Sequence, residues 1–151
     1  MANYNLNDLK KLREETGVSV SDCRQALEDA SGDYKKALEL VKAKAAEKAE
    51  KKADRDTGEG LIDAYLHQNG KIGAMVQVLC ETDFVARTEE FKNLTHALAM
   101  QVAAMNPKDV AELLSQEYIK DASLTIEQMV KEAIQKTGEN IVIKKFDRFS
   151  L

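Results

Sequence analysis

The dipeptide Asn69-Gly70, set between two β-rich runs, constrains the fold of this chain most strongly. Residues 61–80 read LIDAYLHQNGKIGAMVQVLC. Asn-Gly between such runs is the strongest short signal for a β-hairpin, because a two-residue turn needs positive φ at both central residues. We expect antiparallel strands over residues 61–67 and 71–80. The implied register pairs Leu66 with Gly73, Ala64 with Met75 and Ile62 with Gln77 on one face, and Tyr65 with Ala74 and Leu61 with Val78 on the other.

Two helices and a third strand are predicted to complete this part of the chain. Thr88 is positioned to cap a long helix whose apolar positions run to Met105 and which ends at Asn106 and Pro107. A second helix begins at Thr125, where Thr125 and Gln128 match a capping box, and ends at Gly138. The segment NIVIKKFDRF, residues 140–149, reads as the third strand. The fold class is therefore α+β.

Both faces of the predicted hairpin are substantially apolar, although the helices can cover only one of them. An antiparallel sheet with one solvated face alternates more cleanly than this one does. A second copy of the chain is the simplest cover, so we expect a homodimer through this core. A charge at a central sheet position such as Val76 is expected to weaken the dimer if that face is the interface.

The first 45 residues read as three short helices. Asn5 or Asn7 can cap the first helix, which ends at Gly17, and Ser19 can cap the second. The sequence SGD at residues 31–33 then separates the second helix from the third. A bundle of this size is marginally stable, and its main use is expected to be docking.

The segment KAKAAEKAEKKADRD, residues 42–56, is nearly all Ala, Lys and Glu. Such a composition forms a semi-rigid helical spacer, with Glu47 and Lys51 at a favourable helical spacing. A nucleic-acid patch is the alternative, but interleaved aromatic residues are missing, so a solvated linker is favoured. TGEG at residues 57–60 ends the helix. We predict an N-terminal domain over 1–45, a helical linker over 46–59 and a core domain over 60–151.

Overall composition narrows the class of partner. The chain has 151 residues, 44% hydrophobic and 32% charged, with a net charge of −4. The acidic balance gives no overall footprint for nucleic acid. The N-terminal segment has neither the apolar core of a signal peptide nor the composition of a transit peptide, and no run reaches membrane-spanning length. We expect a cytoplasmic protein whose partner is a protein or small molecule.

Conventional catalytic chemistry is hard to find. The chain has no P-loop, GxSxG or HExxH motif and no glycine pair that would open a dinucleotide site. His67 and His96 read as surface histidines. Cys23 and Cys80 stand far apart and outside any metal-ligand spacing, so buried reduced thiols are favoured over a disulfide or metal site. A Cys80 nucleophile is conceivable, but a cysteine ending an apolar strand is usually inert. An enzyme is therefore not expected.

Phe84 stands out in CETDFVARTEEF, residues 80–91, because it follows an aspartate in an expected solvent-facing connection. One interpretation is a hydrophobic plug that folds under the loop. The other is a wedge, rigidly presented between a strand and a capped helix, that pushes into a partner and rearranges it.

Several motifs together resemble bacterial elongation factor Ts. They are TG followed at fixed spacing by DC and AL at residues 16–27, then CETDFVARTEEFKNL at residues 80–94 and GENIVIKKFDRF at residues 138–149. The resemblance covers nearly the whole chain. It implies an N-terminal ubiquitin-associated-like three-helix domain, an α+β core, no cofactor, and a role in promoting GDP release from the GTPase elongation factor Tu.

The resemblance also implies two sets of partner-binding residues. In that family the Thr-Asp-Phe-Val motif is implicated in displacing the Mg²⁺ ion at the nucleotide site of elongation factor Tu, and the N-terminal domain docks on the GTPase domain. The motif here is Thr82, Asp83, Phe84 and Val85. The matching N-terminal residues are Leu12, Arg13, Thr16, Gly17, Val18, Asp22, Cys23 and Arg24.

Two departures from the family pattern bear on these expectations. Val20 and Ser21 stand where family members commonly carry two methionines, which affects the strength of N-terminal docking. Longer relatives carry more helical sequence or a second core half, where this chain has only residues 107–123, which again implies pairing of two copies. The alternative function is a ubiquitin-associated-like adaptor that binds another protein without exchange activity.

Overall fold

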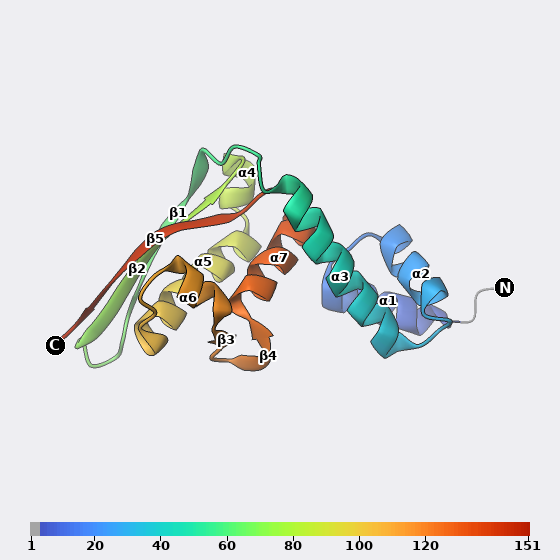
Figure 1. Ribbon diagram of the computed structural model, residues 1–151, viewed down its shortest axis with the longest axis horizontal. Helices are drawn as coiled ribbons and strands as arrows, with labels where there is room; N and C mark the ends of the chain where they lie inside the picture. The colour runs from blue at the N-terminus through green and yellow to red at the C-terminus, as the bar shows by residue number, and fades with distance from the viewer. Residues whose placement is uncertain (1–3) are drawn as a thin grey trace.

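The computed structural model describes residues 4–151, which form an elongated α+β molecule (Figure 1). A bundle of helices lies at the end that holds the N-terminus. A three-stranded sheet with helices on one face lies at the other end, together with the C-terminus. The expected fold class, N-terminal helices followed by a three-stranded antiparallel sheet packed with helices, is confirmed.

The N-terminal bundle consists of α1 (Leu6–Thr16), α2 (Val20–Asp29) and α3 (Tyr34–Lys52). The side chains of Asn5, Ser19 and Asp33 cap the three helices, each by accepting a backbone N–H three residues on. The predicted caps Asn5 and Ser19 are thus confirmed. The bundle has its own small core, which contains Leu12, Val18, Cys23, Ala26, Leu27, Ala30, Ala37 and Val41.

Helix α3 continues without a break from the bundle to the core. Ala45 and Ala49 on its C-terminal half are buried, and this half packs against α7 (Ile126–Thr137). The predicted spacer is therefore confirmed as a helix as far as Lys52. The prediction of a plain solvated linker is wrong, because Ala45 and Ala49 are buried. The predicted domain boundaries, between residues 45 and 46 and between residues 59 and 60, stay a prediction.

The main sheet has the strand order β1-β2-β5, all antiparallel, with β2 in the middle. Its strands are β1 (Glu59–Leu66), β2 (Ile72–Cys80) and β5 (Val142–Ser150). All five predicted cross-strand pairs of the hairpin are present. The pairing of β2 with β5 shifts by one residue between Gln77 and Val78.

The hairpin turn differs from the predicted type. Gly70 has positive φ but Asn69 does not, and the turn is closed by a bond from the Gly70 N–H to the His67 carbonyl oxygen. The His67 N–H also donates to the Ile72 carbonyl, so the loop spans residues 68–71. The predicted register survives because this longer loop is centred on the same two residues, Asn69 and Gly70.

Helices cover only one face of the sheet. Helix α5 (Glu89–Met105) packs against all three strands, and α7 packs against α5. Thr88 caps α5, Asn106 ends it with positive φ, and α7 begins with the predicted capping box of Thr125 and Gln128. Inward-facing strand residues such as Val76 and Val78 are completely buried beneath these helices.

Residues 107–125 contain elements that the sequence did not predict. They are α6 (Val110–Ser115), β3 (Glu117–Tyr118) and β4 (Asp121–Thr125), the two strands forming a small antiparallel ladder. The fully buried side chain of Gln101 in α5 holds this segment, donating to the Glu117 carbonyl (3.0 Å) and accepting from the Ile119 N–H (3.0 Å). A buried amide with both ends bonded fixes where the segment lies.

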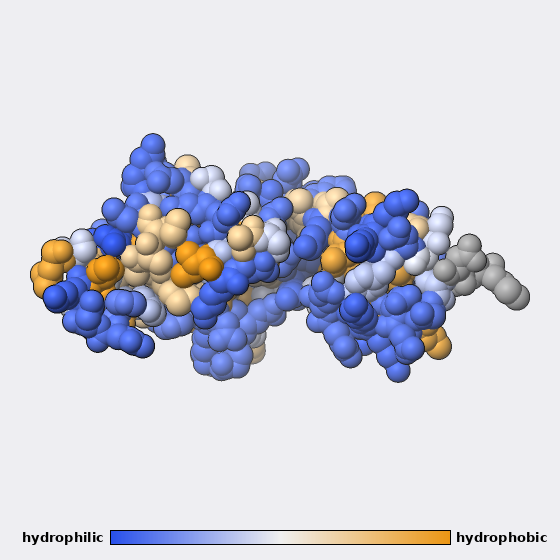
Figure 2. All heavy atoms as spheres, turned by 90° about the horizontal axis from the view of Figure 1, so that it is seen from below, coloured by the Kyte–Doolittle hydropathy of each residue, from blue (hydrophilic) through white to orange (hydrophobic). Residues whose placement is uncertain are grey.

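The other face of the main sheet is open. Exposed apolar side chains gather on it, namely Ile62, Leu66, Met75, Val142 and Phe149. The polar residues Gln77, Lys145 and Asp147 share this face. Seen from below, the surface is mostly hydrophilic, with one broader hydrophobic patch left of centre and smaller ones elsewhere (Figure 2). Val76 lies on the covered face, so the suggestion that a charge there would probe the open face is wrong.

Across residues 4–151, no helix combines the length and the apolar character needed to cross a membrane.

Gly60 is expected to be intolerant of any side chain. Its φ is +154°, and a Cβ there would lie 2.1 Å from the Val78 carbonyl oxygen. Gly60→Ala should therefore lower the free energy of unfolding by about 1 to 3 kcal/mol, the range for a strained backbone site. Gly58→Ala is the matched control, because nothing lies within 4 Å of that position. Thermal melts of both variants test this, and equal melting temperatures would contradict it.

Candidate functional site

The Thr-Asp-Phe-Val motif lies in a single turn of helix. Helix α4 (Asp83–Ala86) follows β2 directly, and Thr82 is its N-cap, whose hydroxyl accepts the Val85 N–H (3.4 Å). The connection was expected to be a loop, so this short helix is a correction. Phe84 is 81% exposed. The plug interpretation of Phe84 is therefore wrong.

Phe84 is exposed because the opposite side of α4 is anchored. Ala86 is buried and Val85 packs against the main core, while α4 as a whole contacts β1, β2 and α5. The Asp83 carboxylate pairs with Arg87 (2.8 Å) along the outer side of the turn. One face of the turn is held by the core, and the other presents an aromatic ring to solvent.

The Glu139 carboxylate holds the backbone immediately before α4. Its Oε1 accepts the N–H groups of Glu81 (3.1 Å) and Thr82 (3.0 Å), and its Oε2 accepts the Thr82 hydroxyl (2.7 Å). Glu139 follows Gly138, which ends α7 in the left-handed conformation. Three bonds to one carboxylate fix both the entry into α4 and its capping residue.

A second set of bonds runs in the opposite direction. The Glu81 carboxylate accepts the Asn140 N–H (2.7 Å) and pairs with Arg55 (3.4 Å). The buried Asn140 side chain donates to the carbonyl oxygens of Ala53 (3.3 Å) and Arg55 (3.0 Å). The start of α4, the end of α7 and the end of α3 are thereby tied together at one point. We call the side chains of Arg55, Glu81, Glu139 and Asn140 the clamp.

Both cysteines are free and completely buried, as expected. Burial raises the pKa of the Cys23 thiol, and burial followed by the nearby Glu139 carboxylate raises the pKa of the Cys80 thiol. A thiol kept protonated is a poor nucleophile. Instead, the Cys80 thiol donates to the Thr82 carbonyl oxygen (3.1 Å), which adds a further contact to the capping residue.

The eight N-terminal residues implied by the resemblance do not share one environment. Leu12, Val18 and Cys23 lie in the core of the bundle, whereas Arg13, Gly17 and Arg24 are exposed and Thr16 and Asp22 are partly buried. Val20, which departs from the family pattern, is 45% exposed among them.

Asp22 of this set has a structural role in the bundle. It accepts bonds from the Ser19 hydroxyl (2.8 Å) and from Lys48 of α3 (3.2 Å). These bonds, the one from Ser19 above all, hold the pKa of the Asp22 carboxyl below its ordinary value. The bonds join the start of α2 to α3 and so fix the angle at which the exposed residues of α2 are presented.

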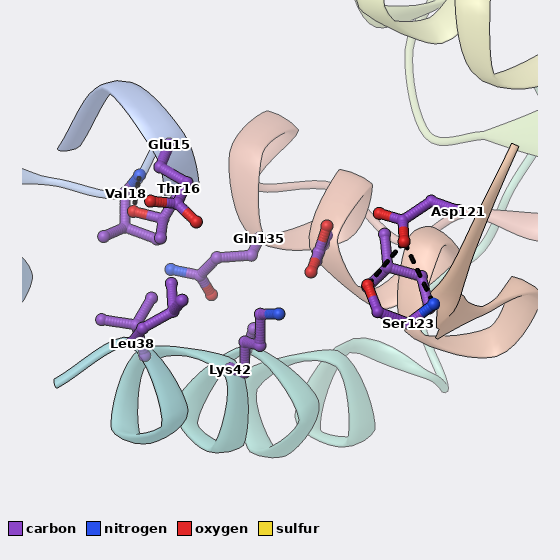
Figure 3. A pocket seen from close by; sticks show the side chains of 12 residues that line it. Glu15, Thr16, Val18, Leu38, Lys42, Asp121, Ser123 and Gln135 are labelled. Atoms are coloured by element: carbon purple, nitrogen blue, oxygen red, sulfur yellow. Dashed lines mark hydrogen bonds between the residues drawn. The ribbon is translucent and has the colours of Figure 1, made fainter. Parts of the chain in front are cut away.

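A cavity of about 250 Å³ lies where the bundle meets the core. Thr16, Val18 and Leu38 line it from the bundle, and Gln135 reaches in from α7 (Figure 3). The buried Oε1 of Gln135 has no hydrogen-bond partner among residues 4–151. The contact between bundle and core thus contains unfilled space beside this amide oxygen.

The structure does not bring the two predicted sets together. Helices α1 and α2 pack with α3, whereas α4 packs with β1, β2 and α5. Among residues 4–151, no three His, Cys, Asp or Glu side chains are grouped so that they could hold a metal ion. His67 and His96 are both exposed and flank Tyr65, with ring centroids 6.3 and 6.0 Å from it.

Sequence reasoning identified the motif at residues 82–85 but missed the clamp. Glu81 and Glu139 stand 58 residues apart, and each accepts backbone N–H groups as well as a side-chain bond, Glu139 from the Thr82 hydroxyl and Glu81 from Arg55. No short motif marks such a contact. The buried Asn140, directly after a glycine that ends a helix, is the one local sign that this loop turns inward.

Comparison with known proteins covers both α4 with its clamp and the N-terminal bundle. The family model described as elongation factor TS matches residues 81–151, which include α4 and the Glu81, Glu139 and Asn140 side chains of the clamp. Elongation factor Ts of Thermotoga maritima is 41% identical, over 95% of this chain and 94% of its own length. The corresponding protein of Thermoanaerobacter sp. (strain X514) is 39% identical, over 93% of this chain and 91% of its own.

Similarity at this level extends over both the bundle and the core. The two alignments run over 186 positions, more than the 151 residues of this chain, so these relatives carry residues that it lacks. With the α4 motif and the N-terminal bundle both in place, the chain belongs to the elongation factor Ts family.

Proposed function

We propose that this protein is a guanine nucleotide exchange factor that binds elongation factor Tu in its GDP-bound form and promotes GDP release. The observation that carries the proposal is Phe84, an aromatic side chain that is 81% exposed on a turn whose backbone is fixed from beneath. Exposing a phenylalanine on a rigid support is unfavourable for a monomer and suits insertion into a partner. This role is consistent with the cytoplasmic location that the sequence predicts.

The proposed mechanism is mechanical rather than chemical. Mg²⁺ in a GTPase is held by few protein ligands together with the phosphates, so a small shift of the protein near it lowers nucleotide affinity. Phe84 would supply the apolar wedge that causes the shift. Asp83, paired with Arg87 on the outer side of α4, would supply a polar contact that orients it.

The N-terminal bundle is proposed to make a second contact with the GTPase. Its residues Arg13, Gly17 and Arg24 are the most exposed members of the predicted set, and the exposed Val20 would add an apolar contact. Leu12, Val18 and Cys23 would support this surface from the core of the bundle.

We also propose that two copies pair through the open face of the sheet. Apolar side chains on this face extend from Ile62 on β1 to Phe149 on β5. Lys145 and Asp147 on the same face carry opposite charges, so two copies related by a twofold axis could pair them. Two sheet faces stacked about 10 Å apart would remove these side chains from water.

A GDP-release assay tests the proposal. Elongation factor Tu loaded with a fluorescent GDP analogue should release it at least about tenfold faster with a saturating amount of this protein. Binding should also be tightest to nucleotide-free elongation factor Tu and weaken when GDP is added, because coupling between two ligands is reciprocal. Binding that is indifferent to nucleotide, with no faster release, would instead identify the adaptor.

A further inference from the structure

One residue of the clamp, Glu139, makes hydrogen bonds that the main sheet does not need in order to fold. All three hydrogen bonds to the Glu139 carboxylate come from Glu81 and Thr82, directly before Phe84. None of them belongs to a helix or to the sheet ladder. Glu139 therefore acts on the segment that presents the aromatic ring and on little else.

The remaining contacts of Thr82 support this view. Its hydroxyl both donates to Glu139 and accepts the Val85 N–H, so Glu139 also orients the oxygen that caps α4. The carbonyl oxygen of Thr82 accepts the Cys80 thiol. Every polar group of the capping residue is thus engaged, and a helix of only four residues, too short to be stable by itself, is held in one orientation.

We propose that Glu139 is a positioning residue for nucleotide exchange: it acts through Thr82 to hold Phe84 in the orientation that displaces part of the GTPase. This inference rests on the proposed exchange function. A ring that can rotate away still contributes contact area to any complex. It cannot, however, impose the strained arrangement that favours the nucleotide-free state over the bound one.

The other two bonded residues of the clamp, Glu81 and Asn140, would support α4 in a similar way. Glu81 bonds to the backbone of Asn140, and Asn140 bonds to the carbonyl oxygens of Ala53 and Arg55 at the end of α3. Force on Phe84 during insertion would pass through these bonds to α3 and α7. A wedge that pushes on a partner needs such support, because otherwise the turn would yield before the partner does.

Glu139→Ala separates positioning from binding. We expect the maximal rate of GDP release at saturating factor to fall at least fivefold, while affinity for nucleotide-free elongation factor Tu changes less than about twofold. Glu139→Gln keeps an oxygen that accepts the two N–H groups, so it should restore most of the rate. Glu127→Ala, which removes an exposed glutamate paired only with Lys131, is the matched control and should behave as the unmodified protein.

Amide hydrogen exchange in the free protein gives a readout that does not depend on activity. In Glu139→Ala the amides of Glu81, Thr82 and Val85 should lose protection, while those of Val76 and Val78 in β2 keep it. Unchanged protection at Thr82 would overturn the proposal. If Glu139→Ala fails to melt cooperatively, Glu81→Ala removes the opposite acceptor of the clamp, and the same two measurements decide.

The possible outcomes distinguish this inference from the function on which it rests. If the unmodified protein does not accelerate GDP release, the proposed function fails. If it does and folded Glu139→Ala is equally fast, only the positioning role fails. A parallel loss of affinity and maximal rate would also overturn it, because that result identifies Glu139 as part of the general binding surface.

Discussion

Phe84→Ala is expected to leave the protein folded and able to bind nucleotide-free elongation factor Tu, yet to reduce accelerated GDP release at least tenfold. Phe84 is 81% exposed, so truncation removes few internal contacts and should change the free energy of unfolding by no more than about 0.5 kcal/mol. A tenfold loss of rate corresponds to about 1.4 kcal/mol of lost differential stabilisation. Asp83→Ala should act in the same direction.

The reason for this split is thermodynamic. A residue that contacts the GTPase equally well with and without GDP adds affinity but cannot favour the empty state. A wedge that fits only after the nucleotide site has been distorted contributes selectively to that state. Removing the wedge should therefore reduce the exchange rate more than it reduces affinity for the empty GTPase.

Stopped-flow release of a fluorescent GDP analogue, measured beside a melting curve for each variant, provides the test. Met105→Ala is a suitable control because Met105 is also an exposed apolar residue, at the opposite end of the 17-residue helix α5 and about 25 Å along it. An unaltered release rate in folded Phe84→Ala would rule out the wedge.

Met75→Glu should convert the protein from a dimer into a monomer. Met75 lies in the central strand on the open face, directly between Ala64 and Asp147. In the proposed dimer the new carboxylate would be buried beside another carboxylate, which costs several kcal/mol when unpaired. A dissociation constant raised at least about 100-fold, roughly 2.7 kcal/mol, is expected.

Sedimentation or light scattering at tens of micromolar measures this effect. The side chain of Met75 is 52% exposed, so the monomer itself should stay folded. Asn93→Glu, which adds the same charge at an exposed position on the helical side of the core, should leave the mass at that of a dimer. A monomeric unmodified protein, or a Met75→Glu variant with undiminished mass, would eliminate this interface.

The sequence was most informative where structure is decided locally. Caps such as Ser19 and Thr88 act on the next helical turn, and the hairpin register depends on a few residues around Asn69 and Gly70. The turn type was wrong because Gly70 alone supplies a positive φ in the longer loop. The segment over residues 107–125 could not be predicted because the side chain that organises it, Gln101, lies in another element.

The candidate site divides along the same line. Phe84 could be found because the residues around it indicate a solvent-facing connection. Only the structure shows that its side chain is exposed and not folded under the connection. The clamp could not be found, because the partners of Glu139, two backbone N–H groups and one hydroxyl, lie more than 50 residues away in the sequence. The N-terminal set illustrates the reverse problem, since a motif does not distinguish a buried residue such as Cys23 from an exposed one such as Arg24.

The continuity of α3 has a consequence for how proteins of this kind can change in length. Its 19 residues span about 28 Å, and one helix carries residues of both the bundle core and the main core. Inserting one residue between Val41 and Ala49 would turn the bundle by about 100° relative to α4 and carry it 1.5 Å farther away. Insertions or deletions tolerated there should therefore come in whole helical turns, because α3 fixes both the distance and the rotation between the bundle and the core.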